Sequence, residues 1–175
     1  MTAARGPRSQ TSSSAGGAGA RWLDDVEGPA WRAFIEASVA LLDVLDRELL
    51  AKHGLSLRDY EVLVRLSEAP ERRLRMAELA SQIQDSASCL SHRVDRLVRD
   101  GLVTREPDPE DRRGRYTRLT GLGMRKLARA SRDHVADVRR LFVDRLSASE
   151  MRTAERAFGR ISAGLAEERS AGSAA

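Results

Sequence analysis

The stretch from Ser86 to Thr120 reads SASCLSHRVDRLVRDGLVTREPDPEDRRGRYTRLT, and it decides the fold. Its first part has apolar residues at helical spacing up to Gly101, which predicts an amphipathic helix with a glycine end signal. Its second part predicts two short strands joined by a loop rich in Arg, Asp and Pro. A polar-faced helix followed by a basic hairpin is typical of a winged helix-turn-helix, a module that binds DNA.

The predicted helix has two chemically different faces. The apolar face consists of Leu90, Val94, Leu97 and Val98. The other face is small and polar in its N-terminal half, which would let the helix approach base edges. The residues expected to contact DNA from this helix are Ser86, Ser88, Ser91, His92 and Arg96. The alternative is that each is an ordinary exposed helix residue. Arg93 lies nearer the core boundary, where a carboxylate would hold it.

The segment before this helix completes the motif. Apolar periodicity predicts short helices that begin at Leu57 and Met76, with a minor strand at 73–75 between them. The tight turn at 84–86 then joins the second short helix to the polar-faced one. The predicted fold is therefore mainly α, a winged helix-turn-helix with a small β-hairpin wing.

Long helices flank this lobe, and they organise the predicted domains. Residues 28–54 and 121–166 carry broad apolar stripes, more than a small core needs, so we expect them to form a dimerisation region. Residues 55–120 form the DNA-binding lobe. The tails at 1–27 and 167–175 lack large apolar residues over most of their length, and we predict that they are mostly disordered.

Composition restricts the class of protein without identifying it. The net charge of +4 suits nucleic acid, but nearly all the basic residues are Arg, which weakens charge as evidence. A lone cysteine, Cys89, excludes an intrachain disulfide framework and favours a reducing environment. No apolar run reaches membrane-spanning length and no secretion signal is present, so we expect a cytoplasmic protein with no membrane contact.

Patterns of catalysis and metal binding are missing from the sequence. It has no Gly-rich phosphate loop, Ser-His-Asp arrangement or metal-ligand spacing, and the histidines His53, His92 and His134 are isolated from one another. We therefore expect neither an enzyme nor a cofactor.

Several short motifs resemble the multiple-antibiotic-resistance regulator (MarR) family of transcription factors. They include His53-Gly54-Leu55-Ser56 before the second helix and Leu97-Val98-Arg99-Asp100-Gly101-Leu102-Val103 at the end of the polar-faced helix. The most specific is Asp108-Pro109-Glu110-Asp111-Arg112-Arg113, followed by Leu119-Thr120 and Gly123, which matches the wing signature of the family.

The resemblance implies a homodimer that binds a pseudo-palindromic operator in double-stranded DNA. It implies a repressor released by a small phenolic or aromatic ligand, or by oxidation. It also implies that the wing residue Arg113 enters the minor groove while Asp111 braces the loop, with Arg112 and Arg115 at phosphates. The alternative for these residues is a solvated charged turn.

Two further implications concern control of DNA binding. Ligands of the family bind in a crevice between the dimerisation helices and the DNA-binding lobe, which here would be lined by Trp31, Ser38, Tyr60, Glu61, Arg93 and Arg105. The alternative is that Trp31 and Tyr60 are core residues. Redox sensing through Cys89 is an alternative mode of regulation, although oxidation-sensing relatives carry their cysteine in the first helix. A winged-helix module that binds proteins and has no operator is the remaining alternative.

Overall fold

Helices dominate the structure, a computed structural model that describes residues 21–108 and 114–172. The chain divides into two compact units, the first ending at Glu36 and the second beginning at Ala37. The elements in order are α1 (Glu27–His53), α2 (Leu57–Glu68), the 3-10 turn η1 (Pro70–Arg72), β1 (Arg73–Arg75), α3 (Met76–Ile83), α4 (Ala87–Arg99), β2 (Val103–Pro107), β3 (Arg115–Leu119), α5 (Gly121–Leu141), the 3-10 turn η2 (Val143–Arg145) and α6 (Ala148–Gly172). The predicted fold class is confirmed.

Local signals in the sequence set the ends of several helices. Gly54 ends α1 with a φ of 61°, a backbone conformation that glycine adopts without steric cost. Ser56 caps α2 in a capping box with Asp59. Ser147 and Glu150 form a capping box at the start of α6, in which the backbone N–H of Ser147 donates to the Glu150 carboxylate at 2.8 Å.

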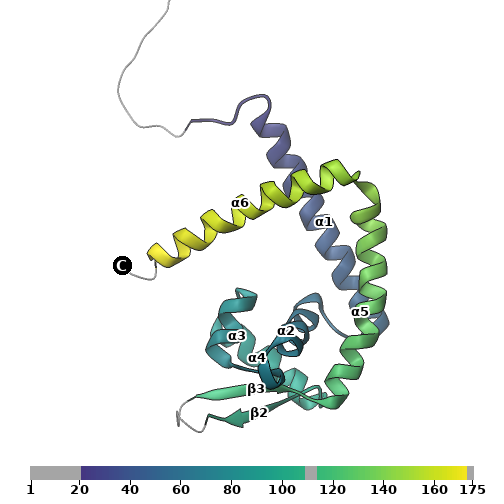
Figure 1. Ribbon diagram of the computed structural model, residues 1–175, viewed down its shortest axis with the longest axis vertical. Helices are drawn as coiled ribbons and strands as arrows, with labels where there is room; N and C mark the ends of the chain where they lie inside the picture. Colours follow the sequence, from purple (N-terminus) through teal and green to yellow (C-terminus); the bar gives the residue numbers. More distant parts are fainter. Residues whose placement is uncertain (1–20, 109–113, 173–175) are drawn as a thin grey trace, which may run out of the picture. The chain divides into compact units, whose positions relative to one another are not determined.

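The three strands form one antiparallel sheet in the order β1, β3, β2. Figure 1 shows β2 and β3 side by side as the hairpin that carries the wing. The minor strand β1 pairs with β3 through Leu74 and Thr117, and it joins the helix-turn-helix to the wing. The loop residues 109–113 lie outside the described part of the chain.

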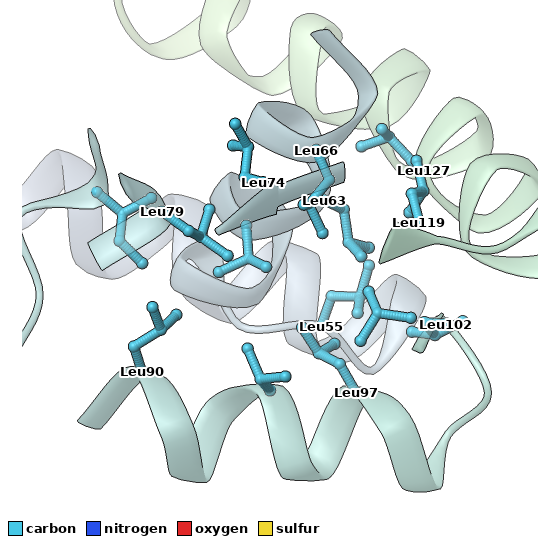
Figure 2. Close-up of a cluster of buried hydrophobic side chains, with 14 of the residues drawn as sticks. Leu55, Leu63, Leu66, Leu74, Leu79, Leu90, Leu97, Leu102, Leu119 and Leu127 are labelled. Atoms are coloured by element: carbon cyan, nitrogen blue, oxygen red, sulfur yellow. The ribbon is translucent and has the colours of Figure 1, made fainter. Parts of the chain in front are cut away.

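A leucine-rich core fills the lobe between these elements. Figure 2 shows Leu90 and Leu97 pointing from one side of α4 toward Leu55, Leu63 and Leu79. All five are at most 1% exposed. The apolar face predicted for α4 is thus confirmed for Leu90 and Leu97, and Val94 is buried with them.

Val98 differs from that prediction, since 38% of it is exposed. At about 100° per residue it lies roughly 80° around the helix from Leu90, which places it at the rim of the apolar face.

The junction between the wing and α5 explains the Leu-Thr-x-x-Gly motif. The Thr120 hydroxyl caps α5 by accepting from the N–H of Gly123 at 2.9 Å, and the Thr120 N–H donates to the Leu102 carbonyl at 3.1 Å. A Cβ on Gly123 would collide with that same carbonyl oxygen. Glycine is therefore required where α5 crosses the start of β2.

The C-terminal boundary differs from the sequence prediction. We expected a disordered tail from Glu167, but α6 continues to Gly172. Ala, Glu and Arg are good helix formers, so the segment extends the helix without burying large apolar residues. At the other end, the predicted tail at 1–27 is described only from Arg21, and Glu27 already belongs to α1. No helix in the described ranges is both long and apolar enough to cross a membrane.

Candidate nucleic-acid interface

The N-terminal half of α4 presents small polar side chains to solvent. Ser86 is the N-cap, and its hydroxyl accepts from the backbone N–H of Cys89 at 3.2 Å. The Ser86 and Ser88 hydroxyls lie 3.3 Å apart, and His92 is exposed one turn further along. Because none of these side chains is large, the backbone of α4 can come close to a base edge.

A buried carboxylate fixes the rotation of α4 against α2. Asp59 is 3% exposed, and its two oxygens accept from Nη2 of Arg96 at 2.6 and 2.8 Å. Arg93 approaches Asp59 at 3.4 Å and bridges to Asp85 at the same distance, as we expected of a carboxylate-held arginine. A buried carboxylate needs such partners, so α4 has one favoured orientation.

Arg96 therefore has a structural partner as well as a predicted contact with DNA. Its side chain is 47% exposed, although Asp59 holds the guanidinium. The prediction that Arg96 contacts DNA therefore applies only to the solvent-exposed part of its side chain.

Arg105 ties β2 to the same helix. Its Nη2 donates to the hydroxyl of Ser91 at 3.0 Å and forms an ion pair with Asp95 at 3.1 Å. Ser91, which we predicted to contact DNA, is half-buried and engaged by this arginine. The contact couples the wing hairpin to α4.

A second carboxylate braces the base of the wing. The Asp108 side chain is 1% exposed and forms an ion pair with Arg75 on β1 at 2.9 Å. Nε of Arg75 donates to the Tyr116 hydroxyl at 3.1 Å, and Arg73 lies over the Tyr116 ring. The sheet thus holds Asp108, the last described residue before the loop, in place.

The same face of the hairpin carries a further ion pair. Arg118 donates through Nε to Glu106 at 2.6 Å, and this hydrogen bond lowers the pKa of Glu106 below its usual range. The interaction joins β3 to β2 two residues before the loop begins.

Of the four predicted wing residues, only Arg115 lies in the described part of the chain. Asp111, Arg112 and Arg113 lie outside the described residues, so their roles stay predictions. Arg115 is exposed at the start of β3, and its Nη1 donates to the Gly114 carbonyl at 2.9 Å. That position is compatible with the predicted phosphate contact.

The predicted ligand-binding residues differ in the contacts that the structure shows for them. Tyr60 and Glu61 line a common cavity of about 320 Å³ on α2. Arg93 and Arg105 are engaged by the carboxylates and the serine described above. Ser38 lies in the second unit, whereas Trp31 lies in the first, 6.0 Å from the Phe34 ring between ring centroids.

Cys89 is exposed in the first turn of α4. Its thiol is therefore accessible to solvent. Among the residues that the structure describes, no group of three or more His, Cys, Asp or Glu side chains could hold a metal ion.

The sequence motifs did not identify Asp59, Arg75 or Asp108 as parts of this interface. Asp59 was detectable only as the third residue of a capping box after Ser56, because its contact with Arg96 joins positions far apart in the chain. Asp108 opens the wing motif, but its burial depends on the short strand β1.

Comparison with known proteins gives a consistent result. The family model described as "MarR family" matches residues 55–114. The HTH-type transcriptional repressor YetL of Bacillus subtilis is 31% identical over 88 residues, which are 50% of this chain and 53% of that protein. The chain therefore matches about half the length of this curated relative.

Two solved structures from Streptomyces coelicolor match over much longer spans. The transcriptional regulator AbsC is 38% identical with a TM-score of 0.80, over 85% of this chain and 99% of that one. Sco3205, solved in complex with DNA, is 40% identical with a TM-score of 0.81, over 83% of this chain and 92% of that one. These relatives are regulators rather than enzymes, in agreement with the sequence prediction. The chain belongs to the MarR family of DNA-binding transcriptional regulators.

Proposed function

We propose that the protein is a homodimeric repressor whose two α4 helices bind the half-sites of a pseudo-palindromic operator. The observation that carries this proposal is the exposed polar N-terminal half of α4, held in one orientation by the Asp59–Arg96 ion pair. In winged helix-turn-helix proteins this helix occupies the major groove, and the wing lies on the adjacent backbone or minor groove.

Exposed apolar residues on the terminal helices support the dimer. Along α1 they are Trp31, Phe34, Ile35, Val39 and Leu42, and along α6 they are Phe158, Ile161 and Leu165. Each is between 37 and 63% exposed in the single chain. Apolar stripes of this length are normally covered by protein, and a second copy offers a matching pair.

Release by a small aromatic ligand is supported by the cavity beside Tyr60 and Glu61. Leu57 and Val64 add apolar walls to it, and Arg65 adds a cation that suits an acidic phenol. A ligand there would contact α2, the helix that orients α4 through Asp59. Binding would therefore weaken affinity for the operator by favouring a different α2–α4 arrangement.

The experiment is a gel shift and an anisotropy titration with the duplex that lies upstream of the protein's own gene. We expect a specific complex at moderate salt that unrelated duplex competes away only weakly. Replacing Arg113 with Ala should weaken binding by about 1–3 kcal/mol if the wing arginine enters a groove. Arg152→Ala, which removes the charge of an exposed residue on α6, is the matched control.

Two outcomes would overturn parts of the proposal. Equal affinity for the upstream and unrelated duplexes would show that the upstream DNA holds no operator, and it would favour a winged helix that binds other partners. Unchanged affinity of the Arg113 variant would leave the wing as a solvated turn. Repression itself is tested by a reporter gene behind the same duplex, whose expression should rise when the regulator is deleted.

Regulation by oxidation is the second candidate, and the exposure of Cys89 in the first turn of α4 favours it. An oxidised sulfur at this position would add bulk where the helix meets a base edge. Treatment with peroxide should then abolish DNA binding by the wild type and spare the Cys89→Ser variant. Equal loss in both proteins, or no loss in either, would dismiss it.

A further inference from the structure

A basic cavity lies where the end of α1 meets the start of α5. Its volume is about 320 Å³, at the lower end of the range for small-molecule sites. The lining residues are Lys52, His53, Leu122, Arg125, Lys126 and Arg129. All but one of them carry a basic group, and no carboxylate lines the cavity.

Two of these residues are fixed in place by acids outside the cavity. Lys52 forms ion pairs with Glu48 and with Asp137, each at 2.9 Å. His53 Nε2 lies 2.8 Å from the carboxylate of Asp133, and its side chain is only 13% exposed. These contacts fasten the end of α1 to α5 and give one wall of the cavity a defined shape.

The remaining three cations have no acidic partner in the part of the chain that the structure describes. Arg125 and Arg129 are one turn apart on α5, and Lys126 lies between them. Like charges at this spacing repel and cost helix stability, so an anion placed between them would be stabilising. A Cβ on Gly121 would lie 3.6 Å from Nη1 of Arg125, which places this guanidinium beside the positive end of the α5 dipole.

The chemistry of the side chains defines the class of ligand. Guanidinium groups bind phosphate and carboxylate oxygens through paired N–H donors, while a lysine supplies a compact charge. Leu122 adds a small apolar surface beside them. We propose that this cavity binds a small dianion, with a phosphate monoester as the best match for its cations and its volume.

The cavity is distinct from the predicted DNA-contacting surface. Leu122 packs 3.6 Å from the Cβ position of Gly101, which follows the C-terminal end of α4. Ser86 and Ser88 lie at the other end of this 13-residue helix, roughly 20 Å away at 1.5 Å per residue. The inference rests on the α1–α5 cavity alone and does not depend on the operator or on the Tyr60 cavity.

The test uses the full chain and two probes, inorganic phosphate and glycerol phosphate. Each is titrated calorimetrically at constant ionic strength against chloride, and thermal unfolding is followed in parallel because a bound ligand raises the midpoint. Arg125→Gln and Arg129→Gln should each weaken binding roughly tenfold, as expected for one lost charge-assisted hydrogen bond. Arg132→Gln removes the same charge from an exposed position of α5 outside the cavity, and its affinity should change less than about twofold.

The outcomes separate a small-molecule site from a contact with the DNA backbone. Tighter binding of glycerol phosphate than of inorganic phosphate, lost in both cavity variants, supports the proposal. The proposal is overturned if the Arg125, Arg129 and Arg132 variants all bind the two probes with equal affinity. It is also overturned if the cavity variants bind phosphate like the wild type but lose about one unit of the salt slope for duplex binding, since the cations would then be backbone contacts.

Discussion

The DNA-binding lobe and the terminal helices bury their apolar residues to very different extents. In the lobe, Leu55, Leu63, Leu79 and Leu97 are at most 1% exposed. In α6 no described residue is buried, and Ile161 is 52% exposed. The lobe therefore has a core of its own, whereas α6 has an apolar stripe that only another surface can cover. The contrast shows that internal packing specifies the lobe, and it fits the proposal that a second copy covers the stripe of α6.

Removing the Asp59 carboxylate should have the largest effect on the lobe. Asp59→Ala removes the carboxylate that Arg93 and Arg96 share, and it removes one half of the capping box of α2. We expect a loss of about 3–5 kcal/mol in the free energy of unfolding, the usual cost of breaking a buried ion pair. Urea unfolding measures it.

The matched control is Asp95→Ala, which removes a carboxylate from an exposed ion pair with Arg105. Its cost should stay below about 1 kcal/mol. Similar losses for the two variants would contradict the role given to Asp59.

Shortening a core side chain tests whether the lobe is self-contained. Leu97→Ala should cost about 2–5 kcal/mol, since a 1%-exposed leucine leaves a cavity. The loss should be the same at low and high protein concentration, because the contacts of Leu97 lie within one chain. Thermal unfolding over a hundredfold range of concentration provides the check, and a loss that depends on concentration would show that the core is shared between chains.

Placing a charge on the apolar stripe of α6 should change assembly and leave the lobe folded. Ile161→Glu is expected to convert the proposed dimer to monomers, because burying an unpaired carboxylate in an interface is strongly unfavourable. Sedimentation velocity measures the mass of the particle, and far-UV circular dichroism measures the helix content. Ser162→Glu adds the same charge at the next exposed position and should stay dimeric. A dimeric Ile161→Glu protein would place the interface elsewhere.

The smallest expected effect is a pH dependence at the contact between α2 and α5. His134 packs on the Tyr60 ring at 4.7 Å, and burial lowers the pKa of His134 while Asp137 opposes the shift. The unfolded chain then binds a proton more readily than the folded one. Stability is therefore full above about pH 6.5 and falls as the pH drops below it.

Urea unfolding between pH 7.5 and 5.5 measures this slope. His134→Gln should flatten it, whereas His92→Gln, at an exposed position of α4, should keep it. If stability depends on pH equally in the wild type and the His134 variant, His134 is not the cause of the pH dependence.

The order of the elements followed from local patterns in the sequence. The capping residues Ser147 and Thr120, the glycine after α1 and the apolar spacing of α4 each act within a few residues, so they are visible without a structure. The helical end of the chain was missed, because 167–172 extends α6 through backbone propensity and carries no apolar signal.

Most contacts between residues far apart in the chain could not be predicted from such local patterns. The expectation that a carboxylate holds Arg93 was confirmed, but the identity of Asp59 depends on how α2 packs on α4. The same holds for Asp108, whose partner Arg75 lies on another strand. The basic cavity was missed for the same reason, since Lys52 and Arg129 meet only in the folded chain.

The most direct test of the central claim is the stoichiometry and symmetry of the complex with the upstream duplex. Hydroxyl-radical footprinting, combined with sedimentation of the complex, measures both. We predict two chains per site and two protected half-sites about one helical turn apart, 10–10.5 base pairs from centre to centre. One chain on an asymmetric footprint, or no protection at moderate salt, would contradict the account.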